Sequence, residues 1–579
     1  MQVIETQRAG GVLIERDVPA RMRDGIALKS DIYRPAATSG YPVLLMRQPY
    51  GKGLAQSQIM RHPIWYARRG YIVVVQDIRG RWGSEGEFDL HVPDIEDGYD
   101  SVEWAAQLDG SNGRVGMYGN SFGALTQLQA AIARPPHLVA IAPAMSTLDF
   151  YRYRFYRNGM PAIGFMHMWA TTLGAGHASR LGDHPEAAQL FATTGRRLEP
   201  VFGHLPLRAA PGLTRKHAPM YHTWLDHQAY DDYWKSLSME RRLSEIDVPG
   251  LHFGGWYDLY CDSTVRAYTG LRKRAATQRA RESQYLYFGP WGHGPVLSQF
   301  IGDRDFGPAA KPAVDEEIVR WYDHWLKQER PGPYPAPRAR IFVLGANEWR
   351  DFAEWPPVDS RPVPVYLLST SGATSTAGDG RLASEPAADE EPDAYVYNPR
   401  NPVPSFGGKP DQDPARNPIG AIDHQRVETR NDILVYTGDV LDRPVELAGW
   451  VTVELWAASS ATDTAFTAKL LEVLPDGRAY NLCDSIIRAA SRDSVEDPRP
   501  LVPFEPYRFA FEVGPIHAVI PLGHRLRLEV SSSNYPAYAR HLNYFGPLDE
   551  GTLEDARYAT QLVFHDREHA SRLVLPIRG

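Results

Sequence analysis

The first part of the chain alternates short apolar runs with longer amphipathic segments. Residues 41–46 and 71–75 are almost entirely apolar, which is typical of strands buried on both faces of a parallel sheet. Residues 59–69 and 94–108 instead place apolar side chains at helical spacing. This alternation predicts an α/β sheet with crossover helices.

The pattern changes at about residue 146. From there to residue 240 the chain is rich in Met, Trp, Tyr, Arg and His and shows no strand-like alternation, which predicts an inserted helical cap. Apolar runs typical of buried strands return at 250–253 and 284–288. A helical segment over 314–328 then completes the α/β unit before a Pro-rich boundary.

Beyond residue 335, polar and apolar residues alternate with a period of two. Strand-like runs separated by turn residues indicate an all-β sandwich, which we expect to be a jelly roll. The clearest runs are residues 340–344, 365–368, 451–456 and 525–530. The predicted organisation is an α/β domain in two parts (1–145 and 241–335), a helical cap (146–240) and a C-terminal jelly-roll β-domain (336–579).

The composition is that of an ordinary soluble globular protein. Of 579 residues, 43% are hydrophobic and 23% charged, and the formal net charge of −8 argues against nucleic acid or an anionic membrane as a partner. The two cysteines, Cys261 and Cys483, exclude a disulfide framework, and no Cys/His cluster has the spacing of a zinc site. Because no signal peptide or membrane-spanning stretch is visible, we expect a cytoplasmic protein. We also expect that the protein needs no metal or other cofactor.

The segment Gly119-Asn120-Ser121-Phe122-Gly123 is the main candidate for chemistry. A short apolar run precedes it, and a run rich in Ala, Leu and Gln follows it, so Ser121 is predicted to lie at a strand-to-helix turn. A G-x-S-x-G elbow holds a serine exposed in a strained conformation, and the flanking glycines avoid collisions with the strand and the helix. Ser121 is therefore the candidate nucleophile.

A serine hydroxyl needs a base, and the base needs an acid that orients it. Asp258 follows the predicted strand at 250–253, and His293 follows the strand at 284–288, each in a Gly-rich segment. This order of Ser, Asp and His at the ends of strands is that of α/β-hydrolases. We predict a triad of Ser121, Asp258 and His293, with Asp262 and Asp247 as competitors for the acid.

The oxyanion formed during acyl transfer also needs hydrogen-bond donors in place. The backbone N–H of Phe122, directly after the nucleophile, is expected to be one. The second should come from the segment 46–52, which has no glycine run that would supply a backbone donor. Tyr50 is the candidate there through its hydroxyl, although a Tyr in a Pro-Tyr-Gly turn is equally typical of simple packing.

These motifs resemble the family of bacterial cocaine esterase, α-amino-acid ester hydrolases, glutaryl-cephalosporin acylases and X-Pro dipeptidyl-peptidases. The resemblance covers nearly the whole chain, including the β-domain. The runs that carry it are 47–50 (Arg-Gln-Pro-Tyr), 76–80 (Gln-Asp-Ile-Arg-Gly), 84–88 (Ser-Glu-Gly-Glu-Phe), 113–121 (Gly-Arg-Val-Gly-Met-Tyr-Gly-Asn-Ser), 255–258 (Gly-Trp-Tyr-Asp), 289–293 (Gly-Pro-Trp-Gly-His), 476–482 and 523–534.

The resemblance implies an α/β-hydrolase domain with an inserted helical cap and a C-terminal jelly roll. It also implies Ser121 as nucleophile, Asp258 as acid, His293 as base, and Tyr50 with the Phe122 N–H as the oxyanion hole. Asp77 is expected to be structural, because its charge beside Arg79 and Arg81 suggests ion pairs that fix the loop.

The surroundings of the triad favour a simple esterase. Family members that act on α-amino acyl groups carry a carboxylate cluster partly just after the triad Asp, whereas here only Asp262 is acidic. The proline-specific peptidases of the family are longer, typically with an extra N-terminal helical domain. Tyr260, Phe155 and Trp169 are candidates for an aromatic acyl pocket, although ordinary cap packing explains them equally well.

Two other functions stay open on the sequence. One is an amide or peptide hydrolase of the same family, either an X-Pro dipeptidyl-peptidase or a cephalosporin acylase. The other is a carbohydrate-binding protein that uses the aromatic-rich β-domain. The expected partner is a small-molecule ester or acyl substrate, and family members are often dimers or larger, which makes a homo-oligomer a further expectation.

Overall fold

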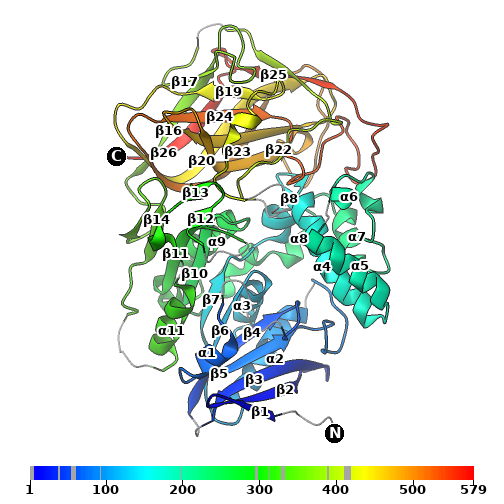
Figure 1. The fold of residues 1–579 in the computed structure, drawn as a ribbon, viewed down its shortest axis with the longest axis vertical. Coiled ribbons are helices and arrows are strands. Elements are labelled where there is room, and N and C mark those ends of the chain that lie inside the picture. The colour runs from blue at the N-terminus through cyan, green and yellow to red at the C-terminus, as the bar shows by residue number, and fades with distance from the viewer. Residues whose placement is uncertain are drawn as a thin grey trace.

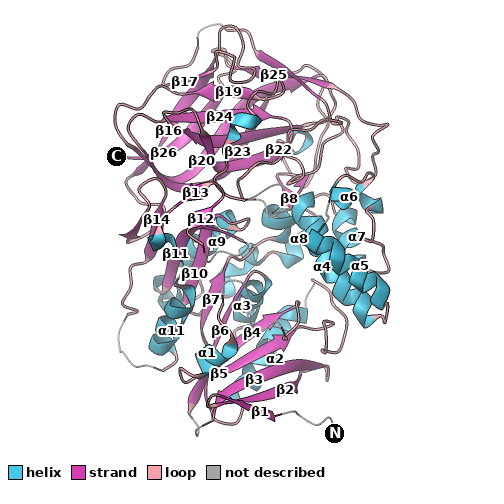
Figure 2. Cartoon of the chain, viewed as in Figure 1, coloured by secondary structure: helices cyan, strands magenta, loops and turns pink. Residues whose placement is uncertain are grey.

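The computed structural model describes residues 6–36, 40–53, 60–90, 93–196, 199–293, 298–311, 313–327, 333–387, 390–409 and 419–579. Residue 59 of the helix predicted at 59–69 and residue 328 of the helix predicted at 314–328 lie outside these ranges. The chain builds two large β-sheets, one in the lower half of the view and one in the upper half, with a group of helices beside them (Figures 1 and 2).

The N-terminal half is built on a mixed sheet whose central strands are parallel. Every neighbouring pair from β5 to β14 is parallel, and the pairs outside them are antiparallel. In order across the sheet, the strands are β1 (Thr6–Ala9), β2 (Val12–Arg21), β3 (Ala27–Pro35), β5 (Ile72–Asp77), β4 (Tyr41–Gln48), β6 (Ser111–Asn120), β7 (Leu138–Ala144), β10 (Gly250–Tyr257), β11 (Gln284–Gly292), β14 (Ala339–Val343) and β15 (Glu348–Phe352). The predicted α/β sheet is confirmed.

Both faces of this sheet are buried, which explains the continuous apolar runs. In β4, Val43 and Leu45 belong to the core on one face, whereas Leu44 and Met46 belong to the core on the other. Successive side chains of a strand point to opposite faces, so only an unbroken apolar run fills two cores. The flanking helices are α1 (Pro63–Ala67), α2 (Pro93–Ala106), α3 (Phe122–Ala133), α9 (Cys261–Arg274), α10 (Gln278–Glu282) and α11 (Val314–Trp325).

One strand predicted for the β-domain belongs instead to this sheet. The apolar run at 340–344 forms β14, which pairs in parallel with β11 and is followed by the antiparallel edge strand β15. Adjacent residues Ile341 and Phe342 are both buried, as in a two-faced parallel sheet rather than a one-faced sandwich strand. The run is a strand, as predicted, but it joins the first sheet and not the sandwich.

The segment between β7 and β10 is mainly helical, as predicted, and lies beside the sheet (Figure 1). The segment also contains a short two-stranded sheet, β8 (Tyr156–Arg157) with β9 (Met160–Pro161), next to the π-helical turn η1 (Tyr151–Phe155). Its α-helices are α4 (Ile163–Arg180), α5 (His184–Arg196), α6 (Glu199–Phe202), α7 (Pro219–Asp226) and α8 (Asp232–Leu237).

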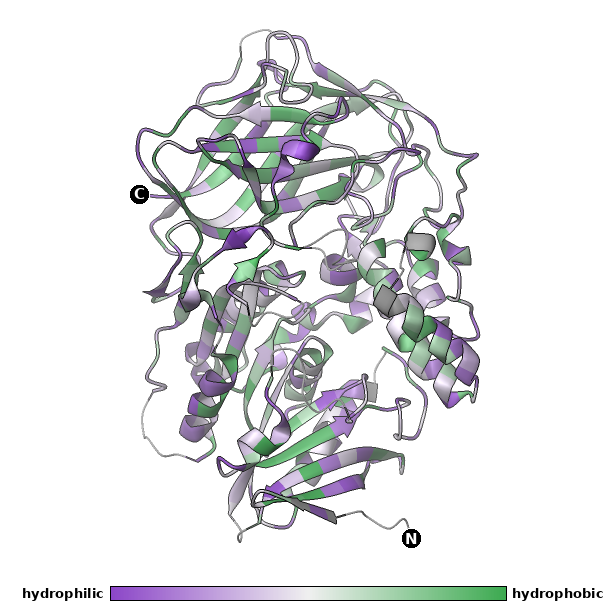
Figure 3. Cartoon of the chain, viewed as in Figure 1, coloured by the Kyte–Doolittle hydropathy of each residue, from purple (hydrophilic) through white to green (hydrophobic). Residues whose placement is uncertain are grey.

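The C-terminal part is a large β-domain. Trp256 of β10 and Phe288 of β11 pack in the same hydrophobic core as Val453 of the β-domain, so the two sheets share one continuous interior. Apolar positions run along the strands of both sheets (Figure 3). The strands are β16 (Ser360–Leu368), β17 (Arg381–Ala383), β18 (Asp393–Tyr397), β19 (Leu434–Thr437), β20 (Val445–Ser459), β21 (Ala465–Val473), β22 (Ala479–Arg488), β23 (Tyr507–Ile520), β24 (Arg525–Ser531), β25 (Ala559–Phe564) and β26 (Arg572–Arg578).

A short hairpin, β12 (Phe300–Ile301) with β13 (Arg304–Asp305), lies between β11 and α11 in the chain. None of the helices in the described ranges is both long and apolar enough to cross a bilayer.

Candidate active site

Ser121 lies at a sharp turn between β6 and α3. Its backbone has φ 56° and ψ −120°, a strained region for a residue with a side chain. At Gly119, where φ is 137°, an added Cβ would lie 3.1 Å from the carbonyl oxygen of Gly123. The Ser121 N–H donates to the Ala144 carbonyl of β7 at 2.9 Å, which anchors the turn to the neighbouring strand. The predicted strand–elbow–helix conformation is therefore present.

His293 bridges Ser121 and Asp258. Its Nε2 lies 3.1 Å from Ser121 Oγ, and its Nδ1 lies 2.7 Å from Asp258 Oδ2. Because an ionised carboxylate can only accept, Nδ1 carries the imidazole proton and Nε2 is left to accept from the serine hydroxyl. Strands β6, β10 and β11 bring these residues to one edge of the sheet, although they are 172 and 35 positions apart along the chain.

Asp258 is held rigidly in this arrangement. It is completely buried, and its second carboxylate oxygen, Oδ1, accepts from the backbone N–H of Tyr260 at 2.6 Å. A buried carboxylate needs such donors to stay ionised. Asp258 is thus fixed with Oδ2 toward His293 Nδ1.

The two competing acids are engaged elsewhere. Asp262 forms ion pairs with Arg157 and with Lys409, the latter at 2.8 Å. Burial opposes its ionisation, but the two cations outweigh that effect and hold the pKa of Asp262 below its usual range. Asp247 is half-exposed and lies 3.9 Å from Arg134. Neither competitor orients His293.

Tyr50 lies in a loop that several contacts immobilise. Its hydroxyl accepts a hydrogen bond from Trp169 Nε1 at 3.2 Å. The carbonyl of the preceding Pro49 accepts from both Arg81 Nε, at 3.0 Å, and Trp82 Nε1, at 2.9 Å. The bonds to Pro49 thus fix the backbone next to Tyr50, and the hydrogen bond from Trp169 fixes the position of its hydroxyl.

The expected ion pairs of Asp77 with Arg79 and Arg81 are not formed. Asp77 accepts instead from the backbone N–H of Lys52 at 2.6 Å, because it lies at the end of β5 directly beside the loop that leaves β4. Burial raises the pKa of the Asp77 carboxyl to about 6, although Lys52 opposes this effect. The loop is fixed as predicted, but by a different partner.

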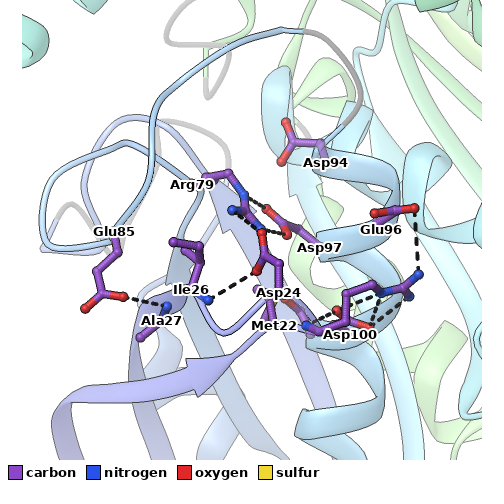
Figure 4. Close-up of polar contacts among 12 residues, drawn as sticks. Met22, Asp24, Ile26, Ala27, Arg79, Glu85, Asp94, Glu96, Asp97 and Asp100 are labelled. Carbon is purple, nitrogen blue, oxygen red and sulfur yellow. Dashed lines mark hydrogen bonds and ion pairs between the residues drawn. The ribbon is translucent and has the colours of Figure 1, made fainter.

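Arg79 binds two other carboxylates instead of Asp77 (Figure 4). It forms ion pairs with Asp97 of α2, at 2.6 Å, and with Asp24, at 2.7 Å. Asp24 precedes β3, so this cluster ties the turn before β3 to helix α2. It supports the scaffold behind the Tyr50 loop.

Phe122 is the first residue of α3, and the first N–H groups of a helix have no acceptor within the helix. Its N–H therefore has no acceptor within α3 and directly follows Ser121 in the chain. The Phe122 ring lies 6.1 Å from the Trp169 ring, which continues the wall formed by Tyr50 and Trp169. The assignment of the Tyr50 hydroxyl and the Phe122 N–H as an oxyanion hole stays a prediction.

The three predicted pocket aromatics occupy two layers. The Tyr260 ring meets His293 edge-on, with ring centres 5.1 Å apart, and Trp169 contacts Tyr50. Phe155 is fully buried and stacks on Trp224 at 4.2 Å, within the cap. Tyr260 thus contacts His293 and Trp169 contacts Tyr50, whereas Phe155 packs against Trp169 with ring centres 5.9 Å apart.

Two further side chains in this region escaped the sequence analysis. Phe165 lies 5.8 Å from Trp169 and 6.5 Å from Tyr260, and the guanidinium of Arg154 lies 3.8 Å from the centre of the Trp169 ring. The signal was the alternation of Arg with aromatic residues at 151–155, which periodicity alone does not mark as part of a site.

Comparison with known proteins decides the family. Residues 24–295 match the X-Pro dipeptidyl-peptidase (S15) family, and residues 334–574 match the X-Pro dipeptidyl-peptidase C-terminal non-catalytic domain. Cocaine esterase of Rhodococcus sp. (strain MB1 Bresler) is 36% identical over 98% of this chain and 99% of its own length. The chain belongs to this family of serine hydrolases. It is accordingly a hydrolase of ester or amide bonds, and the family resemblance predicted from the motifs is confirmed.

Solved structures agree with the fold. An α-amino acid ester hydrolase superimposes with a TM-score of 0.82 at 23% identity, covering 100% of this chain and 98% of that one. An aminopeptidase from a marine sediment Thaumarchaeota archaeon gives a TM-score of 0.81 at 22% identity, covering 100% and 99%. The α/β-hydrolase architecture with a C-terminal β-domain is therefore shared by the whole length of each chain.

Proposed function

We propose that this protein is a carboxylesterase that works through an acyl-enzyme on Ser121. The observation that carries the proposal is the single imidazole of His293, in hydrogen-bond contact with both the Ser121 hydroxyl and the buried Asp258 carboxylate. The full-length similarity to a cocaine esterase supports an ester as the substrate class. Asp262 cannot hold a substrate ammonium, because Arg157 and Lys409 already occupy it, which also favours a simple ester.

The geometry suggests a two-stage reaction. His293 Nε2 takes the proton of Ser121 as Oγ attacks the ester carbonyl carbon, and the carbonyl electrons move to the oxygen. The tetrahedral intermediate expels the alcohol, whose oxygen receives that proton from His293. Water then enters, loses a proton to His293 and attacks the acyl carbon. The acid is released as Ser121 regains its proton.

We assign the oxyanion hole to the Tyr50 hydroxyl and the Phe122 N–H. Tyr50→Phe is expected to lower kcat by about 10²- to 10³-fold with little change in KM, because the donor acts only when charge develops on the oxygen. Steady-state kinetics on a neutral aryl ester would measure this effect. A variant of unchanged kcat and unchanged thermal stability would make Tyr50 a packing residue.

An amide or peptide hydrolase is the second candidate, because the N-terminal match is to a family named for X-Pro dipeptidyl-peptidases. The two readings are separated by kcat/KM on a 4-nitrophenyl ester and a 4-nitroanilide that share one acyl group. We expect turnover of the ester without measurable turnover of the anilide. Comparable rates on the two, or efficient release of an X-Pro dipeptide, would favour the peptidase instead.

The finer features of the organisation are part of the same proposal. We take the β-domain to be a jelly roll and the cap to span residues 146–240. We take the β-domain to begin at 336, near the start of the C-terminal family match at residue 334, although β14 and β15 pair with the first sheet. A cytoplasmic location, a homo-oligomeric state, and independence of nucleic acid, membrane and cofactor stay predictions.

A further inference from the structure

Arg154 is a buried cation that pairs with no carboxylate among the described residues. It is 4% exposed and lies on the π-helical turn η1, at the start of the cap. Its Nε and Nη2 atoms are buried and have no hydrogen-bond acceptor among the described residues. Burial lowers the pKa of its guanidinium, and the groups that oppose this effect are the hydroxyls of Tyr260 and Tyr50 rather than a carboxylate.

Other fully buried arginines among the described residues have partners: Arg81 donates to the carbonyls of Pro49 and Leu173, and Arg488 pairs with Asp463. Some less buried arginines, such as Arg208, leave one guanidinium nitrogen without an acceptor, but of the described arginines only Arg154 leaves two. Leaving guanidinium N–H groups buried and unpaired is costly, so such a group in a native protein calls for a specific explanation.

Aromatic stacking explains where Arg154 lies but not its free donors. The guanidinium carbon is 3.8 Å from the Trp169 ring centre, 4.6 Å from that of Phe165 and 5.5 Å from that of Tyr260. Ring faces attract the cation, whereas its N–H bonds lie in the guanidinium plane and need acceptors at the edge. A planar, bidentate acceptor is what this fork recognises.

A small cavity lies against these donors. Its volume is about 60 Å³, and Arg154, Phe165 and Leu259 line it together with Arg152, Arg157, Lys409, Asp262 and Asp484. Asp262 is shared between Arg157 and Lys409, and Asp484 accepts from Asn534, so the lining retains an excess of positive charge. A cavity of about 60 Å³ has room for more than one water-sized group, so it can admit a small polar group such as a carboxylate.

The cavity is close to the chemistry. Leu259 directly follows Asp258, and the Tyr260 ring that contacts Arg154 meets the His293 ring edge-on. Trp169 lies under the guanidinium and donates to the Tyr50 hydroxyl. A substrate whose acyl chain runs along Trp169 and Tyr260 would therefore bring its far end to Arg154.

We propose that Arg154 is an anion-recognition residue of the acyl pocket, and that the preferred substrates are esters whose acyl group ends in a carboxylate, such as monoesters of dicarboxylic acids. This inference rests on the proposed esterase function. The carboxylate would accept from Nε and Nη2 of Arg154, while the ester carbonyl lies at Ser121. Tyr260, Trp169 and Phe165 would line the intervening methylene chain.

The test compares charged and neutral acyl chains. Probes are the 4-nitrophenyl monoesters of succinate, glutarate and adipate, each matched with the ester in which the free carboxyl is methylated. For at least one chain length, Arg154→Met is expected to lower kcat/KM on the charged probe by about 10- to 100-fold and to leave the neutral counterpart within about threefold. Arg69→Met is the matched control, because the exposed Arg69 also stacks on a tryptophan, with its guanidinium carbon 3.5 Å from the ring centre of Trp65.

Each outcome decides one question. An equal loss on charged and neutral probes would overturn the inference and show that Arg154 acts on the reaction through Tyr50. Wild-type turnover of neutral probes without any effect of Arg154→Met on charged ones would overturn it as well, while leaving the esterase proposal intact. If the wild type hydrolyses neither set, the esterase proposal itself fails. Because Met keeps the apolar contacts of the side chain, we expect the apparent Tm to be unchanged or higher.

Discussion

Ser121→Ala is expected to lower kcat on a neutral aryl ester by about 10^6-fold. Without Oγ no acyl-enzyme forms, and only substrate binding and the oxyanion donors still contribute to the rate. Steady-state kinetics measure the loss. A fluorophosphonate supplies an independent readout: peptide mapping should find one adduct on Ser121 in the wild type and none at that position in the variant.

Two further variants test whether the triad acts as a unit. His293→Ala should lose about as much as Ser121→Ala, and the double variant should lose no more than either, because each single change already removes the activated nucleophile. Losses that multiply in the double variant would mean that His293 and Ser121 do not act in one step. The absence of any adduct in folded wild-type protein would contradict an activated serine altogether.

Asp258→Asn is expected to lower kcat by about 10^4-fold without loss of folded protein. The asparagine can keep an oxygen toward the Tyr260 N–H, but its amide cannot accept from Nδ1 as the carboxylate does, so the imidazole is held in the wrong tautomer and its cation is not stabilised. The pH dependence of kcat should change in the same variant. Both quantities come from one set of steady-state measurements.

Asp247→Asn is the matched control for this prediction. Asp247 was a candidate for the same role, yet it is half-exposed and pairs only loosely with Arg134, at 3.9 Å. Its loss should change kcat by less than about threefold, since exposed pairs of this kind contribute little. A decrease of less than tenfold in Asp258→Asn would show that the acid was assigned to the wrong residue.

The triad was accessible from the sequence because each member follows a local signal. The elbow of Ser121 needs glycines at fixed positions, and Asp258 and His293 each follow an apolar run that can only be a buried strand. Parallel strands end at one edge of a sheet, so chain order and strand ends together predicted that these three side chains meet. Their distances agree with that prediction.

Pairing between distant segments was harder to predict. The run at 340–344 has the same local character in a sandwich as in a parallel sheet, and only its neighbour β11 decides which it joins. The partner of Asp77 likewise depended on which loop lies beside the end of β5, which placed Lys52 there instead of Arg79 or Arg81.

The sequence by itself thus determined the α/β sheet, the family and the candidate triad, because strand burial, helix periodicity and the glycine-bounded elbow are properties of short segments. Only the tertiary structure decided that Asp262 is neutralised by Arg157 and Lys409. It also decided that Arg154 is buried among aromatic rings, with two nitrogens that find no acceptor in the described part of the chain. The physical reason is that the cost of burying a charge depends on every group packed around it, and those groups come from segments far apart in the chain.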